Sequence, residues 1–313
     1  MNARSSTSEL EFAPCALGCA AGDEEILVGR DRLHGLPGEF HVVKCRSCGL
    51  MRTNPRPTLK AIQRYYPEEY GPYRSTQANF LQRGQSPLNG LANFLDAGSR
   101  RVPPLPPGRL LEIGCGAGAF LDRMARSGWQ VEGLEMNAKA AALARSLGYS
   151  VRATNLESAP DPREPYDLIV GWHLFEHLHN PVAALERLHG WSQSGGWLAL
   201  SMPDAGSWEF KLFRERWYAL QVPTHVYHYT PGSLKKVLAR ARWSAERLFW
   251  HDNPNNLLHS LRHCCIDRRW HRAAAYLSDI VQGRRHRALR FCMAKLLGTL
   301  HASGRMTVWA RWI

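Results

Sequence analysis

The 313-residue sequence lacks any long apolar run. No stretch approaches the roughly 20 consecutive apolar residues that a membrane-spanning helix needs. Its first twelve residues, MNARSSTSELEF, are polar and lack the apolar segment of a secretory signal. There is also no internal repeat and no low-complexity tract. Because 44% of the residues are hydrophobic, we expect one sizeable core with appendages in a cytoplasmic protein.

Acidic residues are scarce in the C-terminal quarter. Residues 234–313 contain 16 Lys or Arg and only 4 Asp or Glu, whereas residues 1–233 contain 24 and 23. Two stretches, 256–283 and 284–302, place apolar residues at helical spacing with Arg and His opposite. We predict a basic helical insertion at about 253–304. An anionic membrane surface, which would make the protein peripheral at the inner membrane face, and an ordinary solvated insertion both remain open as interpretations.

Four of the eight cysteines form two close pairs near the N-terminus. Cys15 and Cys19 are spaced C-x3-C, and Cys45 and Cys48 are spaced C-x2-C. In a cytoplasmic protein such pairs are thiols or metal ligands rather than disulfides. Two pairs joined by a 25-residue arm are typical of a zinc ribbon, although unrelated buried thiols or redox cysteines are alternatives. We predict a structural Zn²⁺ in a module spanning 1–52.

The segment LLEIGCGAGAF (110–120) reads as a buried strand, a glycine-rich turn and the start of a helix. Glycine tolerates the dihedral angles of such a turn and lets a ligand approach bare backbone, and the helix N-terminus adds free N–H groups. Gly114, Gly116 and Ala119 would just satisfy the dinucleotide-binding fingerprint G-x-G-x-x-G/A. However, Glu112 lies two residues before the first glycine, where its carboxylate would repel a pyrophosphate and suit an ammonium or sulfonium group.

This acid followed by G-x-G-x-G resembles motif I of the class I S-adenosylmethionine-dependent methyltransferases. The resemblance implies that Glu135, at the end of a second strand in 129–137, accepts the ribose hydroxyls and that Met136 lies against the adenine. Asn155 stands where the family often has Asp. The full set of implied S-adenosyl-L-methionine contacts is Glu112, Gly114, Cys115, Gly116, Gly118, Glu135, Met136, Asn155, Leu156, Trp172 and His173.

Further apolar runs at 166–172 and 195–204, with helical stretches between them, predict a doubly wound α/β sheet that binds ligands at the carboxyl ends of its strands. Strands at 243–252 and 305–313 would complete the seven-stranded Rossmann-like sheet that the resemblance implies. The Pro-rich segment RVPPLPPG (101–108) precedes the first strand. We therefore divide the chain into 1–52, a helical and Pro-rich connector and cap at 53–107, and a methyltransferase domain at 108–313.

The segment CRSCGLMRTNPRP, followed by IQRYYPEEYGPY, also resembles the start of bacterial methyltransferases of the Methyltransf_23 type. Many of these modify sugars, lipids or secondary metabolites. The resemblance implies a small-molecule, sugar or lipid-linked acceptor. Within the two histidine-rich segments WHLFEHLHN (172–180) and VPTHVYHYT (222–230), we predict His225 as the general base, with His177 as the second candidate.

Two other functions are compatible with parts of the sequence. An RNA methyltransferase could use the zinc ribbon and the basic insertion to bind phosphates. The fourth strand ends in GWHLFEH rather than in an Asn/Asp-Pro-Pro-Tyr type motif, which argues against the commonest enzymes that methylate exocyclic amines. A binding protein that kept only the fold is the third possibility. The intact Glu112, glycines and Glu135 argue against it.

Overall fold

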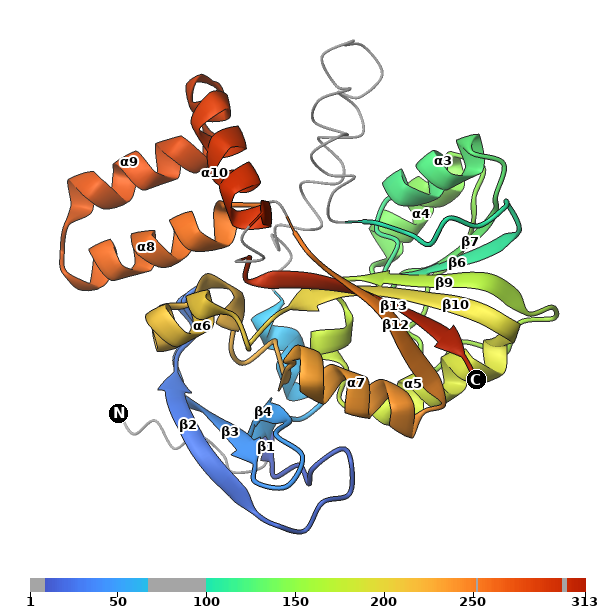
Figure 1. Cartoon of the computed structure of the whole chain (residues 1–313), viewed down its shortest axis with the longest axis horizontal. Coiled ribbons are helices and arrows are strands. Elements are labelled where there is room, and N and C mark those ends of the chain that lie inside the picture. Colours follow the sequence, from blue (N-terminus) through green and yellow to red (C-terminus); the bar gives the residue numbers. More distant parts are fainter. Residues whose placement is uncertain (1–8, 67–99, 252, 300–302) are drawn as a thin grey trace.

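The computed structural model describes residues 9–66, 100–251, 253–299 and 303–313. Its largest sheet has seven strands in the order β12-β13-β10-β9-β6-β7-β8 (Figure 1). Strands β6 to β10 run parallel, whereas β13 is antiparallel to both β10 and β12. The strands are β6 (Arg109–Ile113), β7 (Gln130–Leu134), β8 (Ser150–Arg152), β9 (Tyr166–Trp172), β10 (Ser192–Pro203), β12 (Trp243–Trp250) and β13 (Arg305–Trp312).

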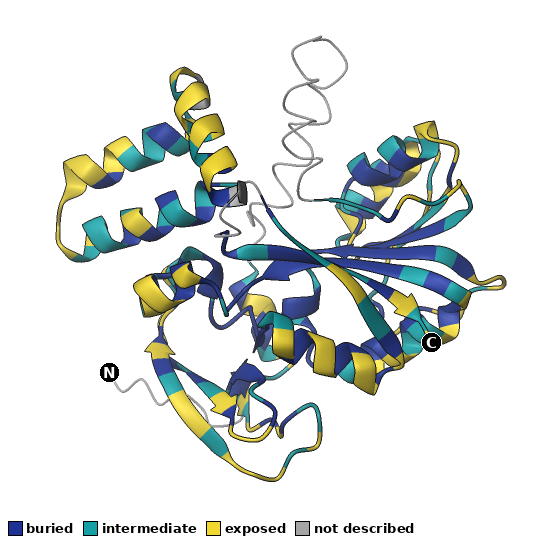
Figure 2. Cartoon of the chain, in the orientation of Figure 1, coloured by how far each residue is buried: buried dark blue, intermediate teal, exposed yellow. Residues whose placement is uncertain are grey.

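Helices cover both faces of this sheet, which explains why its central strands are apolar throughout rather than alternating. On one face α3 (Ala119–Arg126) and α4 (Ala138–Ser146) pack on side chains such as Leu110 and Val170. On the other face α5 (Pro181–Trp191) and α7 (Pro231–Arg240) pack on Leu111 and Ile169. Figure 2 shows the resulting buried layer along the sheet. The predicted doubly wound α/β fold with seven strands is confirmed.

The N-terminal residues form a second sheet whose last strand comes from the part of the chain that holds the seven-stranded sheet. Its order is β11-β4-β3-β2, with β2 (Asp23–Gly29), β3 (Phe40–Cys45), β4 (Met51–Thr53) and β11 (Tyr227–His228). Strand β1 (Leu10–Glu11) pairs separately with β5 (Arg56–Pro57), which the short helix η2 (Ala61–Tyr65) follows. The boundary that we drew at residue 52 therefore falls inside a strand, and the two parts share a sheet. Residues 67–99 of the predicted connector and cap lie outside the described residues.

The predicted helical insertion lies between β12 and β13. It consists of α8 (Asn255–Asp267), α9 (His271–Gln282), the short η6 (Arg284–His286) and α10 (Arg287–Thr299). Helix α8 is fixed at its end by Asp267, which accepts hydrogen bonds from Arg32 at 2.8 and 2.9 Å and from Arg216 at 2.8 Å. Outer faces of α9 and α10 are exposed (Figure 2). Among the described residues, no helix is long and apolar enough to cross a membrane.

Segments between β10 and α7 complete the fold beside the carboxyl edge of the sheet. They are α6 (Trp208–Phe213), η4 (Arg214–Arg216) and η5 (Tyr218–Leu220), followed by β11. After β9, the chain forms η3 (Phe175–His177) before α5 begins at a proline, where the missing N–H is not needed. These segments bring the two histidine-rich stretches to the same edge as the glycine-rich turn.

Candidate functional site

The glycine-rich turn joins β6 to α3 at the carboxyl edge of the sheet. Gly114, Gly116 and Gly118 have φ values of +71°, +54° and +83°, which side chains with a Cβ rarely adopt. The N–H groups of Gly114 and Cys115 donate to the Leu134 carbonyl at the end of β7. The turn therefore exposes bare backbone where β6 and β7 end, as the sequence predicts for a ligand loop.

Glu112 lies in β6 beneath this turn, with only 2% of its surface exposed. Its Oε2 has no hydrogen-bond partner among the described residues. Burial raises the pKa of Glu112 to about 8. A buried carboxyl group without a partner is costly, and an ammonium group beside it would supply the missing donor. The residue thus fits the cationic amino-acid end of S-adenosylmethionine.

Glu135 follows the end of β7 and faces the same turn. Its Oε2 accepts a hydrogen bond from the Gly116 N–H at 2.8 Å, and its Oε1 accepts one from the Asn137 N–H at 2.7 Å. Each carboxylate oxygen has a further lone pair that can accept a hydroxyl group. Glu135 therefore both fixes the glycine-rich turn and keeps acceptor capacity for a ribose diol.

The other predicted cofactor contacts differ from Glu112 and Glu135 in their exposure and hydrogen bonding. Met136 is 65% exposed, next to Glu135. Asn155 accepts a hydrogen bond from the Ser158 N–H at 2.7 Å, so one lone pair of its side-chain oxygen is already used. Leu156 is buried in the core. The indole Nε1 of Trp172 is buried without a partner among the described residues.

Cys115 is buried inside the turn. An ideal Cβ on Gly133 of β7 would come within 2.6 Å of its Sγ, so the thiol occupies space that a larger neighbour would need. Burial raises the pKa of Cys115 well above its usual value, which keeps the thiol neutral. Cys115 thus packs against β7 as a neutral thiol.

A cluster of acidic and histidine side chains lies next to the glycine-rich turn. Ligand atoms of Glu176, His177 and His225 lie within 4.8 Å of one another. Leu174, two residues before Glu176, comes within 3.7 Å of an ideal Cβ on Gly114. The two predicted base candidates therefore lie together, and Glu176 joins them. In the sequence, Glu176 stands out only as a neighbour of the histidines.

Burial governs the protonation of this cluster. Burial lowers the pKa of His177 to about 4 and, with His177 and His228 nearby, lowers that of His225 well below its usual value. Burial raises the pKa of Glu176 to about 8. Both histidines are therefore neutral at pH 7. A neutral imidazole with so low a pKa is a weak base, and the role of His225 as general base stays a prediction.

Comparison with known proteins adds to this geometry. A family of methyltransferase domains, Methyltransf_23, matches residues 88–245, about half of the chain. The chain belongs to this family. A ubiquinone biosynthesis O-methyltransferase of Parvibaculum lavamentivorans is 33% identical to this Methyltransf_23 protein over 130 residues, which are 40% of this chain and 49% of the relative. Another, from Bradyrhizobium diazoefficiens, is 26% identical over 199 residues, which are 59% and 72% of the two chains.

The chain spans 39% to 49% of the length of three of these curated relatives. Among solved structures, an S-adenosylmethionine-dependent methyltransferase of Mesorhizobium loti has 18% sequence identity and a TM-score of 0.46. That match covers 70% of this chain and 96% of the other.

The N-terminal sheet holds the histidine-bearing segment of this Methyltransf_23 protein. Thr53 of β4 donates its N–H to the Val226 carbonyl at 3.0 Å and its hydroxyl to the His225 carbonyl at 2.9 Å. The Nε2 of His228 lies 3.2 Å from the same hydroxyl. Position 225 thus depends on a strand that begins 174 residues earlier in the chain, a contact that no local sequence pattern signals.

Arg305 is a site residue that the sequence did not indicate. It lies at the start of β13, and its Nη1 is 3.0 Å from Nε2 of His173, a residue with φ of +55°. Its Nε donates to Asn256 of α8 at 3.0 Å. The guanidinium therefore lies beside the end of β9, where it adds positive charge to an otherwise neutral group of histidines.

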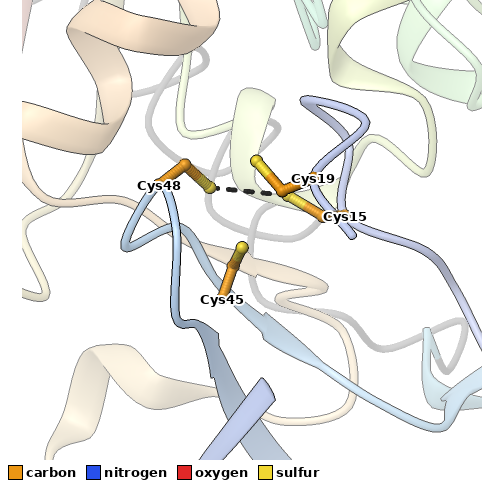
Figure 3. Close-up of side chains that lie close together, drawn as sticks. All are labelled: Cys15, Cys19, Cys45 and Cys48. Carbon is orange, nitrogen blue, oxygen red and sulfur yellow. Dashed lines mark hydrogen bonds between the residues drawn. The ribbon is translucent and has the colours of Figure 1, made fainter. Parts of the chain in front are cut away.

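The four N-terminal cysteines converge as the spacing predicts. Figure 3 shows Cys15 and Cys19 from one loop facing Cys45 and Cys48 from the β3–β4 turn. The sulfur atoms all lie within 4.8 Å of one another, and Cys15 and Cys48 are 3.5 Å apart. Four thiolates around a zinc ion at about 2.3 Å would be about 3.8 Å apart, so the cluster fits tetrahedral zinc after small shifts.

Proposed function

We propose that this protein is an S-adenosylmethionine-dependent methyltransferase that acts on a small-molecule acceptor. The observation that carries the proposal is the pair of buried carboxyl groups around the glycine-rich turn. Glu112 has an unpartnered oxygen, and Glu135 binds the turn through the Gly116 N–H. Membership of the methyltransferase domain family supports the same activity.

When bound, S-adenosylmethionine supplies a methyl group on a sulfonium sulfur, ready for in-line displacement by an acceptor atom. The residues of this chain then have three tasks. Glu112 would pair with the ammonium group, and Glu135 would accept the ribose hydroxyls. Trp172 and Leu156, which are buried, would supply apolar surface beside the cofactor. Orientation of this kind supplies most of the rate enhancement that such a displacement needs.

A proton on the acceptor must leave when the new bond to carbon forms. His225 is the group that we assign to receive it, with His177 as the second candidate, and Nε2 of His225 lies 3.9 Å from Oε1 of Glu176. The named relatives are O-methyltransferases of ubiquinone biosynthesis, which supports an acceptor that presents a hydroxyl group. Small molecules, sugars and lipid-linked compounds belong to this class.

Methyl transfer can be tested before the acceptor is identified. The protein is incubated with radiolabelled S-adenosylmethionine and a bacterial extract separated into small-molecule, lipid and RNA fractions. We expect label in the small-molecule or lipid fraction and strongly reduced label with Glu135→Gln. Label confined to RNA would favour the alternative function. No transfer to any fraction would contradict the proposal.

We infer that the cysteine cluster binds one structural zinc ion. Burial raises the pKa of Cys15 and Cys48, so these thiols stay neutral unless a cation lowers their pKa. Four thiolates would close the coordination sphere and leave no position for substrate. Elemental analysis should give about one zinc per chain, and Cys45→Ser should lose it. Less than about 0.2 zinc per chain in reduced, freshly purified protein would refute the assignment.

We propose an anionic membrane face as a partner of the insertion, which would make the protein cytoplasmic and peripheral. The turn from α8 to α9 carries Arg268, Arg269, Trp270 and Arg272, all exposed, with Trp270 59% exposed at its centre. Arginines near an anionic bilayer contribute about 1 kcal/mol each, and tryptophan prefers the interface. Exposed arginines around an exposed tryptophan suit an anionic membrane surface, whereas a solvated loop has no need of an exposed tryptophan.

Vesicle sedimentation tests the membrane partner. We expect binding to vesicles with anionic lipid, none to neutral vesicles, and loss of binding in high salt. Arg268→Glu combined with Arg269→Glu should abolish sedimentation, whereas Arg163→Glu, in an exposed loop before β9, should not. Equal loss in both variants would reduce the effect to net charge and overturn the assignment to this tip.

A further inference from the structure

We propose that Glu176, His177 and His225 form a binding site for a divalent transition-metal cation, and that this cation receives a hydroxyl oxygen of the acceptor. The second half of the statement rests on the proposed methyltransferase function. The site would be distinct from the four-cysteine cluster, because it offers two imidazole nitrogens and one carboxylate instead of thiolates.

The three side chains converge from two distant segments. Glu176 and His177 belong to η3 after β9, whereas His225 precedes β11. Their ligand atoms lie within 4.8 Å of one another. Ligands of one cation at about 2.1 Å are about 3 Å apart, so rotations of the side chains close the remaining gap. Strand β9 pairs with β6 up to Gly171 and Ile113, which places the cluster beside the glycine-rich turn.

Both imidazole rings are oriented as metal ligands require. Nδ1 of His225 lies 2.9 Å from the Ala219 carbonyl. Nδ1 of His177 lies 2.9 Å from the Thr224 carbonyl and 2.8 Å from the Tyr66 hydroxyl, which can accept from the same N–H. Because a carbonyl oxygen can only accept, each Nδ1 carries the proton, and each Nε2 keeps a lone pair. Backbone carbonyls that fix the tautomer in this way commonly accompany metal-bound histidines.

The carboxylate of Glu176 has no hydrogen-bond partner among the described residues that would explain its burial. It is 1% exposed, and neither oxygen has a hydrogen bond among the described residues. Its nearest histidine nitrogens, in His173 and His225, are 3.6 and 3.9 Å away, beyond hydrogen-bond range. A buried carboxyl group without a hydrogen bond is costly, and its ionised form is found in proteins only where it is paired or coordinates a metal. A cation between Glu176 and the two Nε2 atoms satisfies all three groups together.

The charges around the cluster allow a metal cation in addition to the guanidinium of Arg305. The ring of His173 separates the Arg305 guanidinium from Glu176, with Nη1 of Arg305 3.0 Å from Nε2 of His173 and Oε1 of Glu176 3.6 Å from Nδ1 of His173. Two histidines and one carboxylate leave positions open on an octahedral ion, as in sites where substrate binds the metal. An acceptor hydroxyl in such a position would lose its proton more readily, and the proton would pass to water, because His225 would then ligate the cation in place of acting as the general base. The oxygen left behind would face the cofactor edge.

Mn²⁺ is the best probe, because thiolates of the cysteine cluster do not suit it. Full-length protein with zinc in place and S-adenosylhomocysteine added is titrated with Mn²⁺, and free Mn²⁺ is followed by electron paramagnetic resonance. We expect about one bound Mn²⁺ per chain in the wild type. Affinity should fall at least about tenfold in Glu176→Gln and in His225→Gln.

Glu209→Gln is the matched control, because Glu209 is also a fully buried carboxyl group but lies in α6, outside the cluster. It should bind Mn²⁺ like the wild type. Far-ultraviolet circular dichroism and S-adenosylhomocysteine affinity show whether each variant is folded. If Glu176→Gln does not fold, His225→Gln provides the test of Mn²⁺ binding. Absence of Mn²⁺ binding with intact S-adenosylhomocysteine binding would overturn the metal site alone. Equal losses in Glu176→Gln and Glu209→Gln would also overturn it.

Discussion

Cofactor affinity should depend on pH through Glu112. Burial raises the pKa of Glu112 to about 8 in the free protein, so at pH 7 this side chain is mostly protonated. An ammonium group beside it favours the ionised form. Binding therefore releases a proton, and affinity should increase as pH rises toward 8. Replacement by Gln, which keeps the shape and cannot ionise, should remove this dependence.

The size of the effect follows from the ionised fraction. With a pKa of about 8, about 1% of Glu112 is ionised at pH 6, about 9% at pH 7 and about 50% at pH 8. If only the ionised form pairs with the ligand, affinity rises about 50-fold between pH 6 and pH 8, or about 2.3 kcal/mol. At pH 7, binding should release about 0.9 proton per ligand.

Calorimetry with S-adenosylhomocysteine in two buffers of different ionisation enthalpy measures both quantities. The wild type should show proton release and a rising affinity, and Glu112→Gln should show neither beyond any contribution from the ligand itself. The variant is therefore the baseline to subtract. Identical pH profiles for the two proteins would refute the assignment of Glu112 to the ammonium group.

The contacts that hold the insertion and the histidine segment give two further predictions. Asp267→Asn should lower the free energy of unfolding at pH 7 by about 2 kcal/mol, because hydrogen bonds from Arg32 and the charge of nearby arginines lower the pKa of Asp267 to about 2. That stabilisation exists above pH 4 and disappears as pH falls to 2, so urea denaturation should show wild type and variant converging there. A constant difference down to pH 2 would contradict it. Thr53→Val removes the donor to the His225 carbonyl and should cost about 1–3 kcal/mol, with turnover falling more than S-adenosylhomocysteine affinity. Equal losses of turnover and of S-adenosylhomocysteine affinity would mean that Thr53 contributes only to the overall stability of the fold.

Local patterns were sufficient to predict the central sheet. The apolar run of β6 and the three glycines after it identify a strand, a turn and a helix within a dozen residues, and the physics is local. Glu135 could be predicted for the same reason, because it ends the next strand. The four cysteines depend only on the spacing of two pairs. The sequence therefore indicated the glycine-rich edge of the sheet and the convergence of the four cysteines, whereas the individual cofactor contacts stay a prediction.

Contacts between distant segments were beyond the sequence. The pairing of β4 with β11 places Arg52 opposite Tyr227, and no periodic pattern of apolar residues predicts a strand partner so far away in the sequence. Arg305 reaches His173 only because β13 inserts between β10 and β12. That Glu176 has no hydrogen-bond partner among the described residues is a property of its surroundings, which a motif cannot show. Such tertiary arrangements decide which of many histidines take part in chemistry.

Binding of S-adenosylhomocysteine to the wild type and to Glu135→Gln tests the central claim most directly. Gln keeps an oxygen for only one of the two backbone N–H groups, of Gly116 and Asn137, and replaces the other oxygen by an NH2 donor that cannot accept from a ribose hydroxyl. We predict one site per chain in the wild type and a loss of about 2 kcal/mol, or about 30-fold in affinity, in the variant. No binding by the wild type, or equal affinity in both proteins, would contradict the account.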